Sequence, residues 1–338
     1  MRRANRGVWL GVGALAVSVT VPLLWSGIDP LLDELKRVSP DLLVAALAMV
    51  MVGWAFNAAR LQLLTASAGV TLSRRRAYAL VVSAEFAGSA SPAGVGEALT
   101  YVYLLRQHGL NSARAASLYA VDRLMDLAFF VTAFPLALLV FAFGGRLGEP
   151  LWFALAILAP LSAGVLTVIA LMRHYRPLMR LFGRPLRWLR VSPRRRRRIA
   201  RWIIRFRSAV RLLLGMPRHR LALLYLYCAS HWLLRYSVLP LVLFGLGQSV
   251  PWSYLFLIQG ALLFAGHLTM LPGGAGGVEL GFVALLASWL DPGTLALALL
   301  LWRFVTLHWY LLAGAPVFAI TTGRALTRPV KAEGPGAA

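Results

Sequence analysis

Charged side chains lie within the apolar segments of this 338-residue chain. A charge in the hydrocarbon region of a bilayer costs about 3 kcal/mol on insertion scales, so such residues are usually paired or functional. An arginine can bind a phosphate through two N–H groups at once, and a carboxylate can carry a proton. These residue types therefore predict a central site for an anionic headgroup. The candidates are Arg60, Glu85, Glu97, Asp122, Arg123, Asp126, Arg235, Glu279 and Arg303.

Two of the glutamates each follow a break of proline and glycine in an apolar segment. Proline and consecutive glycines do not readily continue a helix, so Glu97 and Glu279 each begin the helix after a break. A helix N-terminus presents free N–H groups and favours an anion. Each glutamate could simply cap that terminus, or could be displaced or protonated when a phosphate arrives. The predicted site includes the break residues Pro92, Gly94, Gly96, Pro272, Gly273, Gly274, Gly276 and Gly277.

Asp122 and Asp126 are one turn apart and share a helix face. Arg123 is adjacent in sequence, and we expect it to point elsewhere on that helix. Two interpretations of the aspartates stay open. They neutralise arginines as ion pairs between helices, or they belong to the binding site.

Other chemistries have no support in the sequence. The six histidines show no metal-ligand spacing. Cys228 is the only cysteine, which excludes cysteine-cluster metal sites. No Gly-x-Ser-x-Gly sequence supplies a nucleophile, and the glycine-rich break lacks the Lys-Ser/Thr of a phosphate-binding loop. We therefore expect no metal, no cofactor and no catalytic residue.

The composition indicates that membrane-spanning helices position these residues. The chain is 59% hydrophobic and 14% charged, whereas about a quarter of a soluble domain is charged. Six segments are long enough to cross a bilayer. They are approximately 8–26, 41–60, 115–142, 151–172, 221–246 and 294–320. The sequence predicts a single all-α polytopic membrane domain over 1–338.

Charge placement predicts how the two broken segments, 78–105 and 253–290, meet the membrane. Short cytoplasmic loops carry an excess of Lys and Arg. The arginine-rich loops all fall on the cytoplasmic side if each broken segment enters and leaves on one face. We therefore predict two re-entrant segments, with both termini cytoplasmic. Non-helical backbone at membrane depth must be buried or line a wet cavity, so the two breaks should meet near the centre.

The order arginine, Pro/Gly break, glutamate, arginine occurs twice. It predicts two repeats, approximately 41–142 and 221–320, with opposite orientation in the membrane. Interrupted segments in corresponding places of two inverted repeats point to a transporter's binding site. Chance similarity between glycine-rich apolar segments is the alternative.

Residues 173–220 contain seventeen arginines and no acidic residue. Because this segment lies between apolar spans, anionic lipid of the cytoplasmic leaflet is the expected partner, and nucleic acid is not. Apolar residues from Ile199 to Leu213 recur at helical spacing, which predicts an amphipathic helix in the headgroup plane. That helix could recruit anionic lipid. Alternatively, it could bind the inner leaflet and so only fix the orientation of the chain in the membrane. Residues 324–338 should form a flexible tail.

Three motifs together resemble the lysylphosphatidylglycerol synthase transmembrane (flippase-like) family. They are EFAGSASPAGVGE at 85–97, AVDRLMD at 120–126, and LPGGAGGVE at 271–279 with Arg303 downstream. The resemblance extends over about residues 10–320. It differs at Glu85, where the family motif often opens with Asn, and in a shortened later loop. The resemblance implies a flippase-like role. The soluble aminoacyl-transferase domain of the best-known members has no counterpart before Ala338, so we expect no synthase activity.

We therefore expect a lipid or lipid-linked-intermediate flippase of a bacterial or archaeal cytoplasmic membrane, acting as a homo-oligomer or with a partner enzyme. Two other functions stay open. A transferase using a polyprenyl-phosphate donor would need a carboxylate at a loop boundary, where Asp29, Asp33 and Glu34 form the only cluster. A non-transporting partner subunit would bind no lipid alone.

Overall fold

Helices make up the regular structure of the described residues. The computed structural model describes residues 38–143, 151–173 and 210–326 without interruption, and the single residues 20, 35, 36, 192, 201, 204, 207 and 208. Within these residues the chain forms helices and no strand, apart from one isolated β-bridge. The prediction of an all-α protein is confirmed for this part of the chain.

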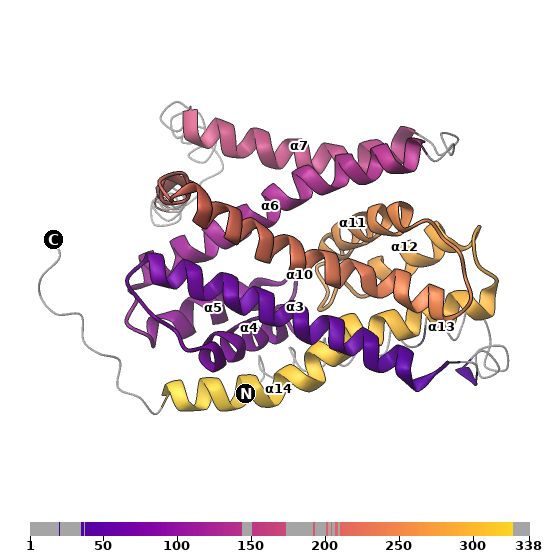
Figure 1. Ribbon diagram of the computed structural model, residues 1–338, viewed down its shortest axis with the longest axis horizontal. Coiled ribbons are helices and arrows are strands. Elements are labelled where there is room, and N and C mark those ends of the chain that lie inside the picture. The colour runs from indigo at the N-terminus through magenta and orange to yellow at the C-terminus, as the bar shows by residue number, and fades with distance from the viewer. Residues whose placement is uncertain are drawn as a thin grey trace, which may run out of the picture.

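The helices follow one another along the chain as shown in Figure 1. They are α3 (Pro40–Ser67), α4 (Arg74–Ser89), α5 (Val95–Arg106), α6 (Ser112–Phe143), α7 (Leu151–Arg173), α10 (Arg218–Gly245), α11 (Trp252–Leu268), α12 (Gly277–Leu286), α13 (Pro292–Arg303), the π-helix η1 (Phe304–His308) and α14 (Trp309–Leu326).

Local sequence explains where these helices begin. Ser39 and Asp291 cap α3 and α13, and each precedes a proline at the first helical position. Asp291 accepts hydrogen bonds from the backbone N–H groups of Gly293 and Thr294, at 3.1 Å each. The helices after the two breaks begin differently, because a glycine with positive φ precedes each of them.

Three predicted spans coincide with helices that are long and apolar enough to cross a membrane. These helices are Pro40–Ser67, Ser112–Phe143 and the continuous stretch Pro292–Arg324. The predicted spans at 151–172 and 221–246 are helical as α7 and α10. The number of full spans and their orientation stay predictions.

The predicted first span, 8–26, lies outside the described residues. The same holds for Asp29, Asp33 and Glu34, for most of the basic segment 173–220, and for nearly all of the tail 324–338. Of the predicted amphipathic helix, residues 201, 204, 207, 208 and 210–213 are described, and all of them are helical.

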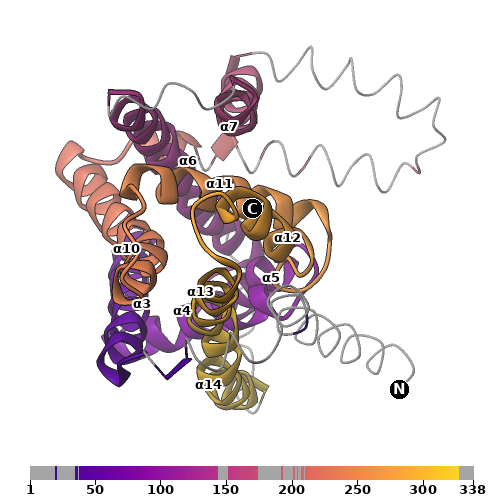
Figure 2. The ribbon, with the colours of Figure 1, turned by 90° about the vertical axis from the view of Figure 1, so that its right-hand side faces the viewer.

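The helices pair in matching ways in the two halves of the chain. α4 packs against α5, and α11 packs against α12. α4 also packs along α14, and α11 packs against α6, so each half supplies a helix to the other. α3 and α10 lie side by side (Figures 1 and 2). Such matched pairing is what two repeats related by a two-fold axis produce. The inverted orientation of the repeats in a membrane stays a prediction.

The two breaks meet, as predicted from the need to bury irregular backbone. Pro92 and Pro272 form an antiparallel β-bridge. Among the described residues, the two non-glycine residues with left-handed backbone are Ala93 (φ 49°) and Met270 (φ 54°), one beside each break. A non-glycine residue rarely adopts this conformation, and such strain persists only where the surrounding structure holds it.

Close backbone contact at the breaks depends on Gly96 and Gly277. A Cβ on Gly96 would overlap the carbonyl oxygen of Ala87, and one on Gly277 would lie 2.7 Å from that of Ala265. We expect Gly96→Ala and Gly277→Ala each to lower the free energy of unfolding by about 1–3 kcal/mol, because the contacting atoms are rigid backbone. Thermal unfolding in detergent measures this effect.

Gly323→Ala is the matched control. Gly323 is helical, and its Cβ would meet nothing within 4 Å. Its melting temperature should stay the same or rise slightly. If Gly96→Ala melts at the same temperature as Gly323→Ala, the packing at the break is looser than the structure indicates.

Candidate functional site

A cavity of about 390 Å³ lies where the two breaks meet. This is within the size range of small-molecule sites. Both halves of the chain contribute to its wall. Its charged and polar lining residues are Asn57, Arg60, Glu85, Ser89, Glu97, Arg123, Asp126, His231, Arg235, Tyr236, Gln259, His267, Arg303 and Thr306.

The predicted site residues divide into those that line the cavity and those behind its wall. The predicted residues in the lining are Arg60, Glu85, Gly94, Glu97, Arg123, Asp126, Arg235, Gly273, Gly274 and Arg303. The others lie outside the lining and are Pro92, Gly96, Asp122, Pro272, Gly276, Gly277 and Glu279. Asp122 and Glu279 do not line the cavity themselves, but each forms an ion pair with an arginine that does.

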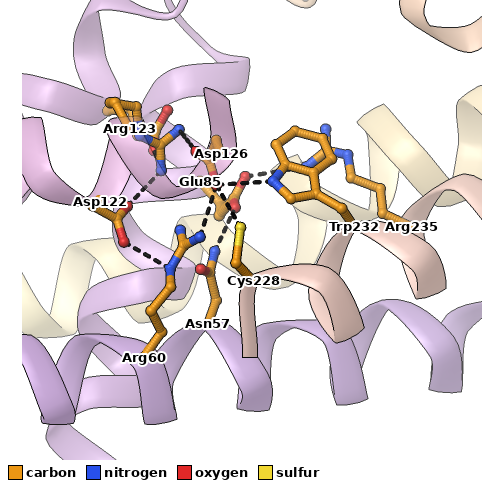
Figure 3. A network of polar contacts seen from close by, with 10 residues as sticks. Asn57, Arg60, Glu85, Asp122, Arg123, Asp126, Cys228, Trp232 and Arg235 are labelled. Carbon is orange, nitrogen blue, oxygen red and sulfur yellow. Dashed lines mark hydrogen bonds and ion pairs between the residues drawn. The ribbon is translucent and has the colours of Figure 1, made fainter. Parts of the chain in front are cut away.

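Arg60 connects α3 to both aspartates of α6 (Figure 3). Its Nε lies 2.7 Å from Oδ1 of Asp122, and its Nη1 lies 2.7 Å from Oδ1 of Asp126. The same Asp126 oxygen accepts hydrogen bonds from Trp232 Nε1 at 2.8 Å and Cys228 Sγ at 3.3 Å, both on α10. All five residues are buried or nearly so. This contact set fits the ion-pair interpretation of the aspartates.

Arg123 bends back onto its own helix, which corrects the expectation that it points elsewhere. Its Nη2 lies 2.6 Å from Asp122 Oδ2, and its Nη1 lies 3.1 Å from Asp126 Oδ2. The three-carbon stem of arginine is long enough for this reach, and positions three apart are neighbours on a helix. Nη2 also lies 3.2 Å from Glu97 Oε1, and the guanidinium lies over the Tyr119 ring. The Arg123 side chain is 36% exposed, so it remains accessible from the cavity.

In the second half, Glu279 and Arg303 form a closed pair. Arg303 Nη2 lies 2.7 Å from Glu279 Oε1 and donates to the carbonyl oxygen of Gly273 at 3.0 Å. Glu279 Oε2 accepts from the backbone N–H of Gly276 at 2.7 Å. The Glu279 side chain has no exposed surface. Glu279 therefore caps α12 and holds Arg303 against the break.

Arg235 is held more loosely than the other three arginines. Its nearest carboxylate oxygen, Glu85 Oε2, is 3.4 Å from Nη1. Asn57 Nδ2 donates to the other oxygen of Glu85, also at 3.4 Å. The Arg235 guanidinium lies over the rings of Tyr310 and Trp232, with its carbon 4.8 and 5.5 Å from the ring centroids. This side chain is 24% exposed and faces the cavity.

The charges around the cavity are nearly balanced. The carboxylates are Glu85, Glu97, Asp122, Asp126 and Glu279, and the arginines are Arg60, Arg123, Arg235 and Arg303. Five negative and four positive charges leave a net charge of −1 if all are ionised. An anionic ligand would therefore have to displace a carboxylate from an arginine, or a carboxylate would have to take up a proton.

Sequence reasoning omitted several residues that contact this network. Asn57 lies one helical turn before Arg60 in an apolar span, so its polarity was a usable signal. Trp232 and Tyr310 carry no such signal, because aromatic residues are common in apolar helices. His231 is buried, with Nδ1 3.0 Å from the carbonyl oxygen of Gly53, as expected of a polar packing group. In the described part of the chain, no three His, Cys, Asp or Glu side chains gather as metal ligands would.

The chain resembles known membrane proteins over most of its length. A family model described as "Lysylphosphatidylglycerol synthase TM region" matches residues 9–314. A UPF0104 membrane protein of Archaeoglobus fulgidus is 23% identical over 289 residues, which are 83% of this chain and 87% of that protein. The range that the family model matches includes both breaks and all nine charged residues of the cavity network.

Proposed function

The chain belongs to the lysylphosphatidylglycerol synthase transmembrane family, and on this premise we propose that it is a flippase for a membrane lipid or lipid-linked intermediate. It binds an anionic, phosphate-bearing headgroup in the central cavity. It does so in the cytoplasmic membrane of a bacterium or archaeon, with both chain termini in the cytoplasm. The basic segment 173–220 contacts anionic lipid of the inner leaflet.

One observation carries this proposal: the cavity lies where the two Pro/Gly breaks meet, and both halves line it. Transporters built from inverted repeats bind their substrates at the interface of the repeats, beside broken helices. Motion of one half against the other opens such a site to alternate faces of the membrane. The strained backbone at Ala93 and Met270 places a bend beside each break, where such motion would be absorbed.

Two of the four arginines are suited to receive the phosphate. Arg123 and Arg235 are partly exposed in the cavity, whereas Arg60 and Arg303 are almost fully buried against carboxylates. A guanidinium presents a planar fork of N–H groups that matches two phosphate oxygens. Of these two arginines, Arg235 has the weaker contact with a protein carboxylate. It therefore gives up the least interaction energy when a headgroup binds.

We expect Arg235→Gln to slow transbilayer lipid movement by about tenfold to a hundredfold, because a hydrogen bond to a charged group contributes about 1.5–3 kcal/mol. The assay follows a fluorescent anionic phospholipid in proteoliposomes, with an impermeant quencher reporting the outer leaflet. Melting temperature should change little, since the Glu85 contact is long and partly exposed.

Arg106→Gln is the matched control, because Arg106 is an exposed arginine at the end of α5 and outside the cavity lining. Its rate should equal that of the unmodified protein. Equal rates for Arg235→Gln and Arg106→Gln would remove Arg235 from the binding site. Unchanged lipid movement after neutral substitution of both Glu97 and Glu279 would show that the two break glutamates take no part in transport.

A further inference from the structure

The two break glutamates differ in how firmly they are held. Glu279 is fully buried, lies outside the cavity lining, and makes close contacts through both carboxylate oxygens. Glu97 lines the cavity, is 21% exposed, and has one ion pair, at 3.2 Å, with Arg123. Arg123 also contacts both aspartates of α6 at similar or shorter distances. Glu97 is therefore the carboxylate that Arg123 can release while keeping other partners.

The surroundings of Glu97 would not stabilise its charge without Arg123. The charged and titratable groups that act on it are Arg123, Asp122, Asp126 and Tyr119 on α6, Glu85 on α4, Tyr101 on its own helix α5, and Arg235 on α10. Three of these are carboxylates. Arg235 already pairs with Glu85. A mostly buried carboxylate that loses its cation among like charges favours its neutral, protonated form.

A headgroup phosphate and Glu97 compete for the same guanidinium. Arg123 has five N–H donors, its side chain is partly exposed, and both Arg123 and Glu97 line the cavity. A phosphate that binds there takes the place of the Glu97 carboxylate. Because the network carries a net charge of −1 when all its groups are ionised, adding an anion without a proton would make that charge more negative.

We propose that Glu97 is a proton-binding site, and that one proton enters the network at Glu97 for each headgroup bound at Arg123. This inference rests on the proposed function and names its coupling ion. The proton comes from water on the side to which the cavity is open, and it forms the O–H bond of a neutral carboxyl group. When the headgroup leaves on the other side, Glu97 loses the proton to water and pairs with Arg123 again. Lipid and proton therefore move together.

The first test counts protons when a phospholipid binds. A water-soluble, short-chain phosphatidylglycerol is added to the full-length protein in detergent, in weak buffer with a pH-indicator dye. This phosphodiester takes up no proton itself near neutral pH. We expect uptake of about one proton per lipid bound, so the affinity should weaken by up to about tenfold for each unit that the pH rises.

Variants of the two cavity glutamates assign the proton to its site. Glu97→Gln should bind the lipid with no proton uptake and with a flat pH profile. Glu97→Asp keeps a carboxylate and should keep the uptake. Glu85→Gln makes the same chemical change at the other cavity glutamate, on α4, and should also keep it. Melting temperatures recorded with each variant show that the proteins compared are folded.

The outcomes separate this inference from the proposed function. If the unmodified protein neither binds nor moves any anionic phospholipid at any pH, the proposed function fails. If it binds and moves lipid without proton uptake, the flippase proposal stands and the proton site is wrong. Proton uptake that persists in Glu97→Gln and disappears in Glu85→Gln would also overturn the assignment to Glu97.

Discussion

Replacing Arg60 by leucine should strongly destabilise the protein. Arg60 is the more deeply buried of the two arginines that contact both Asp122 and Asp126, and both aspartates are buried as well. Removing one partner of a buried ion pair costs about 3–5 kcal/mol, because the remaining charge is left without compensation. We expect little folded Arg60→Leu protein after extraction, and a strongly lowered melting temperature for what remains. Tryptophan fluorescence during heating in detergent measures this.

A compensated variant distinguishes lost charge pairing from lost packing. Arg60→Leu combined with Asp122→Asn and Asp126→Asn removes the uncompensated charges and should recover part of the lost stability. Arg106→Leu is the control for removing an exposed arginine. A melting temperature of Arg60→Leu equal to that of Arg106→Leu would contradict the role of Arg60 as the connection between α3 and α6.

Arg303→Leu is the second substitution with a large expected effect. Its partner Glu279 has no exposed surface, and Arg303 also donates to the Gly273 carbonyl in the second break. The single substitution leaves a buried carboxylate uncompensated and should cost about 3–5 kcal/mol. Combining it with Glu279→Leu replaces the pair by apolar side chains and should recover much of that loss. The melting temperatures of the two singles and the double give the coupling energy.

The Glu85 and Arg235 pair provides the comparison for this cycle. Its contact is 3.4 Å long and both side chains are partly exposed. Its coupling energy should be below about 1 kcal/mol, because the contact is long and both side chains line the cavity. Equal coupling energies in the two pairs would show that the Glu279–Arg303 pair at the second break stabilises the protein no more than the Glu85–Arg235 pair.

These expectations divide the charged network into two kinds of residue. Arg60 connects α3 to α6, and Arg303 binds the backbone of the second Pro/Gly break. Loss of either arginine should therefore lower the stability of the protein. Arg123, Arg235 and Glu97 face the cavity with longer or shared contacts, so their loss should change lipid movement or its pH dependence. Glu97 in the first half of the chain is partly exposed to the cavity, whereas Glu279 in the second half is fully buried, although their sequence motifs are similar.

Several features were determined by the amino-acid sequence alone. Apolar length predicted helices over 41–60, 115–142 and 294–320, and the structure has long apolar helices there. The breaks were predictable because proline and glycine interrupt helices wherever they cluster. Their meeting at Pro92 and Pro272 was predictable because irregular backbone in an apolar environment must be buried. The charged residues that surround the cavity were recognisable because charge is costly within apolar segments.

Only the tertiary structure decided which charges pair. Arg60 meets Asp126 across 66 positions of sequence, and Arg235 meets Glu85 across 150. Spacing along one helix cannot predict such contacts, because they depend on how α3, α4, α6 and α10 pack. The same packing made Glu279 a buried cap and left Glu97 open to the cavity, although both follow a Pro/Gly break. A sequence motif specifies where a helix can begin, but the exposure of its first carboxylate depends on the neighbouring helices.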